Sequence, residues 1–155
     1  MDVELEYDRL GGRLRAIGGA TITYDRLGRR ARTLGDWALE YDELGIRLRS
    51  IGDSELDYGR KSGLPATLGD LTLEYTGFSR QLTHVGPYEV GYDRFGSRVR
   101  TIGPLTLVYD RLGSRPRRAE LPADYPFLPE DLLRVLFLVL YLRTQQEEEE
   151  TPASG

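Results

Sequence analysis

The sequence predicts a mainly β protein, in which an antiparallel meander of seven 17-residue β-hairpin repeats closes into a barrel and one apolar C-terminal α-helix plugs it. Three observations predict this fold: a tyrosine that recurs at a constant interval, two turn signals in each interval, and an apolar helical segment after the last repeat. The tyrosines are Tyr7, Tyr24, Tyr41, Tyr58, Tyr75, Tyr92 and Tyr109, with no residue inserted or lost between them. A fixed short period is the signature of a repeat architecture.

Each repeat reads as two short strands when its positions are counted from the tyrosine as zero. Position −2 is Leu, Ile or Val in all seven repeats, position +10 is Leu, Ile or Val in six, and position +11 is glycine in the same six. The alternation of Val3, Leu5 and Tyr7 has the period of two that is typical of a strand. The recurring glycines disfavour a helix.

The first turn of each repeat follows the tyrosine. The segment Asp8-Arg9-Leu10-Gly11 has the chemistry of a type I turn followed by a glycine in the left-handed region, because aspartate caps such a turn and glycine accepts a positive φ at little steric cost. This combination is typical of a three-residue hairpin loop. The +11 glycine, for example Gly18, marks a second turn that leads back to the next repeat. Seven hairpins give about 14 strands.

A solenoid with one coil per repeat is the alternative interpretation of the same period. It would stack each residue on its copy in the next coil, so that Arg13 and Arg30, or Asp8 and Asp25, would lie about 4.8 Å apart in backbone. Like charges in register are unfavourable. The meander instead places acid-bearing first strands beside arginine-bearing second strands, and we therefore favour the meander.

Two known groups share features with this pattern. The segment Tyr24-Asp25-Arg26-Leu27-Gly28-Arg29 resembles the YD repeats of Rhs and teneurin shells, and the resemblance extends over residues 3–118. A small, nearly symmetric hairpin barrel with an apolar element also resembles the β-flower barrels. Those barrels have been compared with the tubby C-terminal domain, which wraps around a hydrophobic helix and recognises phosphoinositides. The second resemblance concerns architecture alone and transfers no site residue.

The C-terminal helix is predicted over residues 129–144. Pro129 suits the first helical position, and Glu130 and Asp131 suit the positive end of the helix dipole. Residues 135–142 are apolar or aromatic without interruption, so this helix must be buried on all sides or lie in lipid. The apolar stretch 132–142 is shorter than the roughly 20 residues that span a bilayer.

A barrel of this size has room for the helix. About 14 strands spaced about 4.8 Å apart give a radius near 11 Å, and a helix with its side chains has a radius of about 5–6 Å. The difference accommodates about one layer of inward side chains. We therefore expect one domain over residues 1–144, with repeats over 3–120, a linker over 121–128 and the plugging helix over 129–144. A disordered acidic tail is expected over residues 145–155.

Composition and charge limit the classes of function. The net charge is −4, with a balance of +2 in residues 1–118 and −6 in residues 119–155. A chain with net negative charge and no basic run is not expected to bind nucleic acid. Cysteine is absent, which excludes disulfides and thiolate metal sites. The N-terminus lacks the features of a signal peptide, so we expect a cytoplasmic protein, with membrane association as a variant.

Arginine recurs at two positions of the repeat and forms the candidate ligand-binding set. Both positions share strand parity with the apolar +10 position, and +6 pairs with the tyrosine in a three-residue hairpin, which places both sets on the inner face. A register shifted by one residue would instead set Arg13 against Asp8 and Arg15 against Glu6 on the outside. The sequence does not decide between the inner and the outer placement. The set is Arg13, Arg30, Arg47, Arg98 and Arg115 at +6, and Arg15, Arg32, Arg49, Arg100 and Arg117 at +8.

An inward ring of guanidinium groups at the barrel mouth would attract phosphate, carboxylate or an anionic lipid headgroup. Repeats four and five interrupt this ring, because Leu64 and Gln81 occupy position +6. We therefore expect a non-enzymatic binding or scaffold module that associates with anionic lipid or another anionic ligand through its mouth. The alternatives are a structural protein that self-assembles into homo-oligomers, and a peripheral membrane protein anchored by the C-terminal helix.

No catalytic residue, metal ligand or cofactor is predicted. His84 is the sole histidine, and neither a cysteine nor a repeated carboxylate accompanies it in the sequence. The run Glu147–Glu150 lacks the spaced oxygen ligands of a calcium loop. The glycines that recur every 17 residues are turn residues rather than a phosphate-cradling loop.

Overall fold

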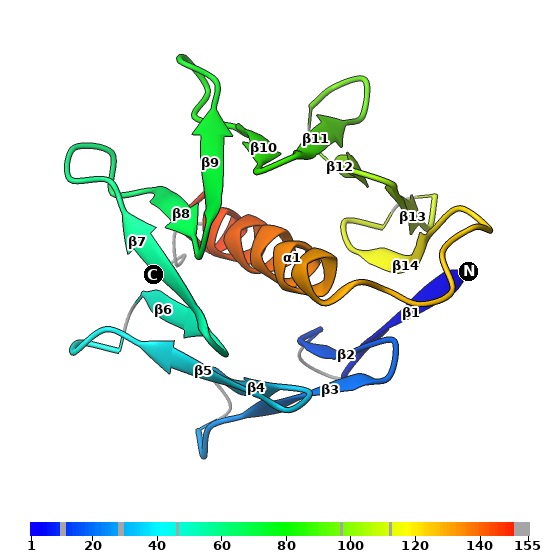
Figure 1. Ribbon diagram of the computed structural model, residues 1–155, viewed down its shortest axis with the longest axis horizontal. Helices are drawn as coiled ribbons and strands as arrows, with labels where there is room; N and C mark the ends of the chain where they lie inside the picture. The colour runs from blue at the N-terminus through cyan, green and yellow to red at the C-terminus, as the bar shows by residue number, and fades with distance from the viewer. Residues whose placement is uncertain (10–11, 28–29, 46, 97, 112, 151–155) are drawn as a thin grey trace.

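The computed structural model describes residues 1–9, 12–27, 30–45, 47–96, 98–111 and 113–150, with side chains described as far as Gln145. In these residues fourteen strands form one closed antiparallel barrel, and one helix follows them (Figure 1). Each strand pairs with its neighbours in sequence, and β1 pairs with β14, so the predicted meander of hairpins is confirmed. The strands are β1 (Asp2–Tyr7), β2 (Leu14–Ile17), β3 (Ala20–Tyr24), β4 (Ala31–Leu34), β5 (Trp37–Tyr41), β6 (Leu48–Ile51), β7 (Ser54–Tyr58), β8 (Pro65–Leu68), β9 (Leu71–Tyr75), β10 (Leu82–Val85), β11 (Tyr88–Tyr92), β12 (Val99–Ile102), β13 (Leu105–Tyr109) and β14 (Pro116–Glu120).

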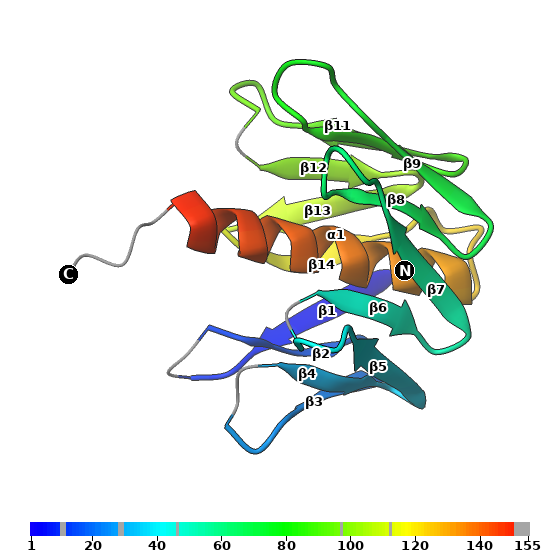
Figure 2. The ribbon, with the colours of Figure 1, turned by 90° about the vertical axis from the view of Figure 1, so that its left-hand side faces the viewer.

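The helix α1 (Glu130–Glu150) runs along the barrel axis with strands on every side (Figures 1 and 2). Its apolar residues form one buried cluster with the inward-facing residues of the strands. Because the barrel wall surrounds this helix, its apolar residues can occupy its whole circumference. The predicted plug is therefore confirmed. Exposure is at most 2% at Leu132, Val135, Leu136, Leu138 and Val139.

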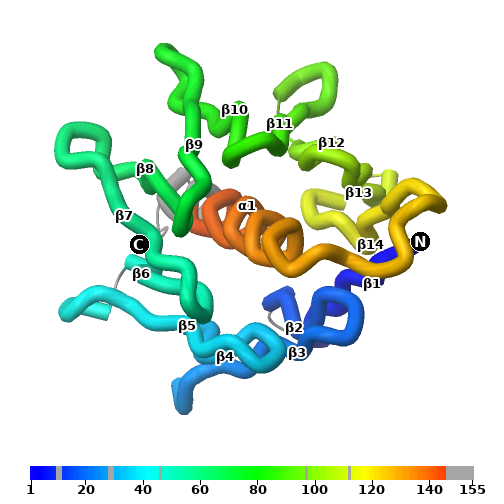
Figure 3. Tube along the Cα trace, in the orientation of Figure 1, coloured from blue at the N-terminus to red at the C-terminus, as the bar shows by residue number. Residues whose placement is uncertain are grey.

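The chain enters the barrel beside its own N-terminus. The segment after β14 passes close to the start of β1 and then continues into α1 (Figure 3). The amino group of Met1 donates a hydrogen bond to the backbone carbonyl of Leu121 at 2.8 Å. This hydrogen bond therefore joins the first strand, which closes the barrel, to the segment that leads into the helix. Among the described residues, no helix combines the length and the hydropathy that crossing a bilayer requires.

The two strands of each hairpin pair with a bulge that the sequence pattern does not reveal. In the first hairpin Glu6 pairs with Ala16 while Tyr7 pairs with Leu14, which leaves Arg15 as an extra residue. The other six hairpins have the same register. A bulge shifts the alternation of side chains by one residue. Positions +7 and +10 therefore both face the core, although strict alternation would place them on opposite faces.

Neighbouring hairpins pair with each other over a much shorter length. Strands β2 and β3 have only the pairs Ala16–Thr21 and Ile17–Ala20, and five other junctions also have two pairs. The hairpins diverge beyond these pairs and flare outward at one end (Figure 1). We call the flared end, where the hairpin loops lie, the mouth. The opposite end, where two-residue turns join neighbouring hairpins, is the turn end.

The +11 glycines form the two-residue turns of the turn end. These six glycines, from Gly18 to Gly103, have φ angles of 55 to 59°. The next residue is Pro87 or Pro104 in two of the repeats, and proline cannot adopt a positive φ. The turns therefore fit type II′, in which only the first central residue needs a positive φ and whose twist matches that of the flanking strands.

The hairpin loops at the mouth are one residue longer than predicted. The amide of Asp8 donates to the carbonyl of Arg13 at 2.9 Å, which encloses four residues rather than three. The aspartate side chain helps to close this wider loop, because Asp8 Oδ1 accepts a hydrogen bond from the amide of Arg13 at 3.1 Å. The predicted turn chemistry is present in repeat three. There the amide of Gly45 donates to the carbonyl of Asp42 at 2.7 Å, and Gly45 has a φ of 69°.

The helix begins one residue later and ends six residues later than predicted. Pro129 precedes α1, and its carbonyl accepts a hydrogen bond from the amide of Leu133 at 2.9 Å. Residues 145–150 are helical, so the prediction of a disordered tail over 145–155 is wrong for those six residues. Glutamine and glutamate are good helix formers, and here they extend a helix that is already nucleated in the barrel. Residues 151–155 lie outside the described residues.

Candidate functional site: the arginine-rich mouth

Seven tyrosine hydroxyl groups bridge neighbouring hairpins around the mouth. Tyr24 donates to the carbonyl of Leu14 at 2.6 Å, and Tyr7 donates to the carbonyl of Pro116 at 2.6 Å across the closure of the barrel. The other five tyrosines donate to the equivalent +7 carbonyls at 2.6 or 2.7 Å. The strand ladder between hairpins does not reach these carbonyls, so the tyrosines supply the donors that the ladder lacks. The recurring tyrosine thus holds the flared hairpins together.

Six of the seven tyrosines that bridge the hairpins have a raised pKa and stay protonated at neutral pH. Burial is the main cause that raises their pKa above the ordinary value of 10.0. The positive charges of Arg115 and Arg13 act in the opposite direction on the pKa of Tyr7 and Tyr24, respectively, but burial dominates. Their hydroxyl groups therefore remain donors to the backbone. The raised pKa applies to Tyr7, Tyr24, Tyr41, Tyr58, Tyr75 and Tyr92.

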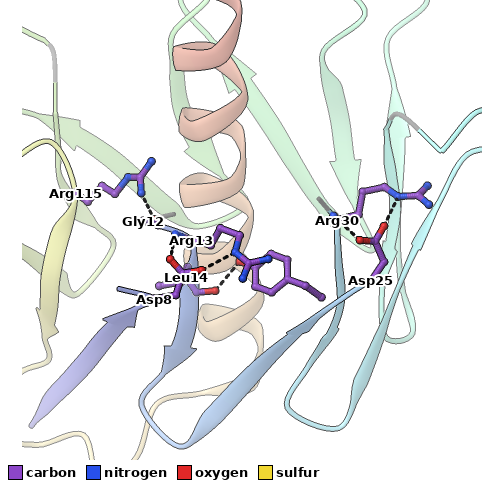
Figure 4. Close-up of polar contacts among 8 residues, drawn as sticks. Asp8, Gly12, Arg13, Leu14, Asp25, Arg30 and Arg115 are labelled. Carbon is purple, nitrogen blue, oxygen red and sulfur yellow. Dashed lines mark hydrogen bonds and ion pairs between the residues drawn. The ribbon is translucent and has the colours of Figure 1, made fainter. Parts of the chain in front are cut away.

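The +6 arginines lie at the mouth, and four of the five lie between an aspartate and a tyrosine. Arg13 Nε lies 2.6 Å from Asp8 Oδ2, and the guanidinium carbon lies 4.4 Å from the ring centroid of Tyr24. Figure 4 shows this pair beside the equivalent pair of Arg30 and Asp25. Charge-assisted hydrogen bonding and cation–π stacking together fix the orientation of each guanidinium. Arg30, Arg47 and Arg98 repeat the stacking, on Tyr41, Tyr58 and Tyr109, at 5.4, 4.4 and 4.7 Å.

In four repeats, the side chain at position +6 also connects its hairpin to the loop of the next one. Arg30 Nη1 donates to the carbonyl of Gly45 at 3.1 Å. Arg115 donates to the carbonyl of Gly12, which joins the last hairpin to the first (Figure 4). Gln81, which replaces arginine in repeat five, keeps this contact through Nε2 and the carbonyl of Gly96 at 2.9 Å. The +6 side chains therefore have a structural role that one neutral residue can also perform.

The +8 arginines lie on the outer face of the barrel and are exposed. Strict alternation of side chains along the strand would place these arginines on the inner face. That prediction is wrong, because the bulge shifts the alternation by one residue between positions +10 and +7. They therefore leave the candidate ligand-binding set. Arg117, for example, points to solvent and lies 3.3 Å from Asp110 Oδ1 through Nη1. The residues that leave the set are Arg15, Arg32, Arg49, Arg100 and Arg117.

Two cavities lie between the C-terminal half of α1 and the circle of seven tyrosines that bridge the hairpins. The flare of the hairpins creates this space, because the barrel widens while the helix keeps a constant diameter. The first cavity has a volume of about 440 Å³ and the second of about 580 Å³, both within the size range of small-molecule sites. The arginines that line the first are Arg13, Arg30, Arg98, Arg115 and Arg143, and those that line the second are Arg47, Arg80 and Arg143.

Arg115 departs from the repeat pattern. Asp110, the aspartate of its own repeat, lies within ion-pair distance of Arg117 instead. In the part of the chain that the structure describes, Arg115 forms no ion pair, although its side chain is partly buried beside the first cavity. The positive charge of Arg115 is therefore less compensated than that of the other +6 arginines.

Arg143 of α1 is a mouth residue outside the candidate set that the sequence predicts. It lines both cavities, because α1 leaves the barrel through the mouth. Arg80 also lines the second cavity, and its guanidinium donates to the carbonyl of Ser62. It occupies position +5, where the repeat has no arginine elsewhere except Arg29. The predicted gap of repeats four and five is thus partly filled.

Charge is divided between the two ends of the barrel. Positions +1 to +6 of the seven repeats, which form the hairpin loops, contain 13 Arg or Lys and 6 Asp or Glu residues, a balance of +7. The turn end consists of the six turns, Met1-Asp2 and residues 121–131, and it contains 7 Asp or Glu residues and no Arg or Lys. A mouth that gathers positive charge around low-dielectric cavities favours anions.

Comparison of the chain with protein-family models, curated proteins and solved structures finds no match of any kind. The resemblance to YD repeats and to β-flower barrels therefore stays a prediction, since a closed hairpin barrel does not identify a family. Within the described residues, no group of three or more His, Cys, Asp or Glu side chains is arranged to hold a metal ion.

Proposed function

We propose that this protein is a non-enzymatic binding module that takes an anionic ligand, with phosphate or carboxylate groups, at the mouth of its barrel. The observation that carries this proposal is the cavity of about 440 Å³, where α1 and four hairpins bring five arginines together. Arg98 and Arg115 lie in the loops of two different hairpins and Arg143 lies in α1, so the hairpins and the helix have to assemble before the site exists.

The chemistry of the cavity fits such a ligand. A guanidinium group carries five N–H donors in a planar fork, and Arg30, for example, donates to only Asp25 and Gly45 among the described residues. Tyrosine faces form the apolar walls of the cavity, and their hydroxyl groups are engaged with the backbone. An anion in this cavity would meet several charged donors between the helix and the tyrosine walls.

The C-terminal end of α1 brings opposing charge to the same region. The helix leaves through the mouth and carries the sequence Glu147–Glu150, which adds four negative charges. Charges separated by less than the Debye length, about 8 Å at physiological ionic strength, interact appreciably. We therefore expect Gln at all four positions to strengthen anion binding several-fold.

Titration calorimetry with inositol hexakisphosphate at low ionic strength tests the proposal. The variant R98Q/R115Q should bind at least about tenfold more weakly than the wild type, since charge-assisted bonds to two guanidinium groups are lost. The matched control R100Q/R117Q removes the same charge from the outer wall of the same hairpins and should bind like the wild type. Equal losses in both variants would show non-specific attraction, and the proposal would then fail.

End-to-end self-assembly is the second candidate function, and the division of charge between the mouth and the turn end favours it. The described strands form a closed barrel without an open sheet edge, so opposite ends are the surfaces that would meet. Light scattering at low and high salt tests this candidate. Assembly that dissolves in salt and is lost in D36N/D53N/D70N supports it, whereas a monomer at all concentrations contradicts it.

Membrane anchoring by α1 is the third candidate. The apolar side chains of the helix, such as Leu136 and Leu138, have 0% exposure inside the barrel. Anchoring would therefore require the helix to leave the barrel and to expose the inner face of every strand. The observed contacts favour the first two candidates over this one.

A further inference from the structure

The tips of the hairpin loops carry large apolar side chains that contact little of the protein. Position +3 of the repeat holds Leu27, Leu44, Phe78 and Phe95, with exposures of 79, 81, 105 and 88%. We call these four residues the tip ring. The same position holds Lys61 in repeat four, and leucine in repeats one and seven, where the residues lie outside the described part of the chain.

Turn chemistry does not explain these residues. A type I turn favours aspartate, asparagine or serine at its first position and glycine at its last, and it is compatible with most residues between them, so it does not require a leucine or a phenylalanine. Single exposed apolar residues are common on protein surfaces. Here, however, the most exposed large apolar residues recur at one position of the repeat. Because their loops lie at the mouth, these exposed apolar side chains are concentrated at one end of the barrel, which makes that end a candidate interaction surface.

The loops at the mouth are basic when taken together, although an arginine precedes only two of the four tip-ring residues, Leu27 and Phe95, and Glu43 precedes Leu44. Position +2, next to each tip, is arginine in five of the seven repeats, and the loops together have a balance of +7. Leucine or phenylalanine beside arginine suits the boundary between lipid headgroups and acyl chains, where the apolar group enters the boundary and the guanidinium contacts phosphate. The five residues are Arg9, Arg26, Arg60, Arg94 and Arg111.

All these loops lie at the same end of the barrel, around the helix (Figures 1 and 2). A flat surface that approaches the mouth can therefore meet several tips at once. Several weak contacts on one rigid body combine into a much stronger one, because the later contacts are made at a high effective concentration. One tip alone would not hold the protein at a surface.

We propose that the mouth end docks on an anionic lipid bilayer, with the tip ring in the headgroup–acyl boundary and the loop arginines on lipid phosphates. This inference deepens the proposed function, because it makes a lipid headgroup the source of the anion. The acidic turn end of a second copy fits less well. The charge of that end is opposite to the charge of the mouth, but Phe127 and Met1 are its only large exposed apolar residues among those described.

Co-sedimentation with vesicles tests the inference. Vesicles of equal parts phosphatidylserine and phosphatidylcholine should bind the full-length protein, and pure phosphatidylcholine vesicles should not. The variant L27S/L44S/F78S/F95S changes only exposed side chains, and unchanged circular dichroism confirms its fold. It should bind the anionic vesicles at least about tenfold more weakly than the wild type, because the apolar contacts are lost. Its affinity for inositol hexakisphosphate should not change.

The outcomes separate the two proposals. Wild-type protein that binds inositol hexakisphosphate but no vesicles overturns the lipid inference and leaves the proposed function intact. A tip-ring variant that binds vesicles as well as the wild type also overturns it, since plain charge attraction would then suffice. Absence of binding to both probes overturns both proposals. Self-association of the wild type without vesicles, abolished in the tip-ring variant, assigns the ring to a second copy and overturns the lipid inference.

Discussion

The guanidinium carbon of Arg134 lies 4.1 Å from the ring centroid of Trp37, so the one charged residue within the apolar stretch of α1 stacks on the sole tryptophan of the chain. Arg134 Nε is buried and has no hydrogen-bond partner among the described residues. Stacking on the indole face offsets part of the cost of burying this charge. Trp37 begins β5 at the turn end, so its fluorescence reports whether the helix is in place.

The first prediction concerns this contact. The change Arg134→Ala removes the group that covers the indole, and we expect acrylamide to quench Trp37 more strongly. We also expect a loss of about 1–2 kcal/mol in the free energy of unfolding, from the cation–π contact and the packing of the arginine stem. Arg49→Ala, on the outer wall, is the control and should leave quenching unchanged. Identical quenching in wild type and Arg134→Ala would refute the seated helix.

The second prediction concerns the seven tyrosines that bridge neighbouring hairpins. The change Tyr75→Phe removes the donor to the carbonyl of Pro65, a 2.6 Å bond. We expect urea unfolding to show a loss of about 1–2 kcal/mol, because a partly buried carbonyl loses its partner. Tyr125→Phe is the matched control, since the structure records no hydrogen bond from this hydroxyl to a described residue. Equal stability of Tyr75→Phe and the wild type would mean that the bridges between hairpins are dispensable.

The third prediction concerns alkaline pH. Six of the tyrosines that bridge the hairpins have a raised pKa in the folded protein, chiefly because they are buried, whereas tyrosines of the unfolded chain ionise near 10.0. Burial and the hydrogen bond to Asp131 also raise the pKa of Tyr88, to about 12. The stabilisation is therefore complete below pH 10 and is lost as the pH rises above it, because the unfolded chain then releases protons that the folded chain keeps.

Urea titrations from neutral pH to pH 11 measure this effect. The unfolding midpoint should fall steeply once the pH exceeds the ordinary tyrosine value of 10.0, and Tyr75→Phe should make that fall shallower. A midpoint that does not depend on pH in this range would show that the tyrosines ionise equally in the folded and unfolded chains.

The fourth prediction compares two neighbouring glycines of one turn. Gly18 has a φ of 59°. Gly19 does not have a positive φ, and a Cβ atom at this position would meet open space. We expect Gly18→Ala to lower the free energy of unfolding by about 1–2 kcal/mol. We expect Gly19→Ala to be neutral or to stabilise by about 0.4–1 kcal/mol, because it restricts the unfolded chain. The reverse order in thermal unfolding would exclude a type II′ turn.

The periodic residues allowed most of the fold to be predicted from the sequence. Position +11 needs glycine for its φ angle, and the tyrosine marks each hairpin, so the number and order of the strands follow from spacing alone. The apolar circumference of the helix required an enclosing wall, and the barrel provides that wall.

The orientation of the arginines could not be predicted in full. An unbroken alternation of side chains would place position +8 on the inner face. The bulge at this position inserts an extra residue, and no particular residue type marks it in the sequence. Arg15 and Arg13 therefore have different environments, the outer wall and the mouth, although two positions separate them. The length of the helix was underestimated for a different reason. The charge of Glu147–Glu150 indicated a solvated tail, whereas the propensity of these residues favours continuation of the helix.

Nuclear magnetic resonance of the arginine side-chain Nε–H groups can show whether the anion binds at the mouth, because it observes both sets of arginines in one titration with inositol hexakisphosphate. We expect the signals of Arg98, Arg115 and Arg143 to shift and saturate together, while those of Arg100 and Arg117 stay in place. Shifts of equal size at the mouth and on the outer wall, or at the outer wall alone, would contradict binding at the mouth.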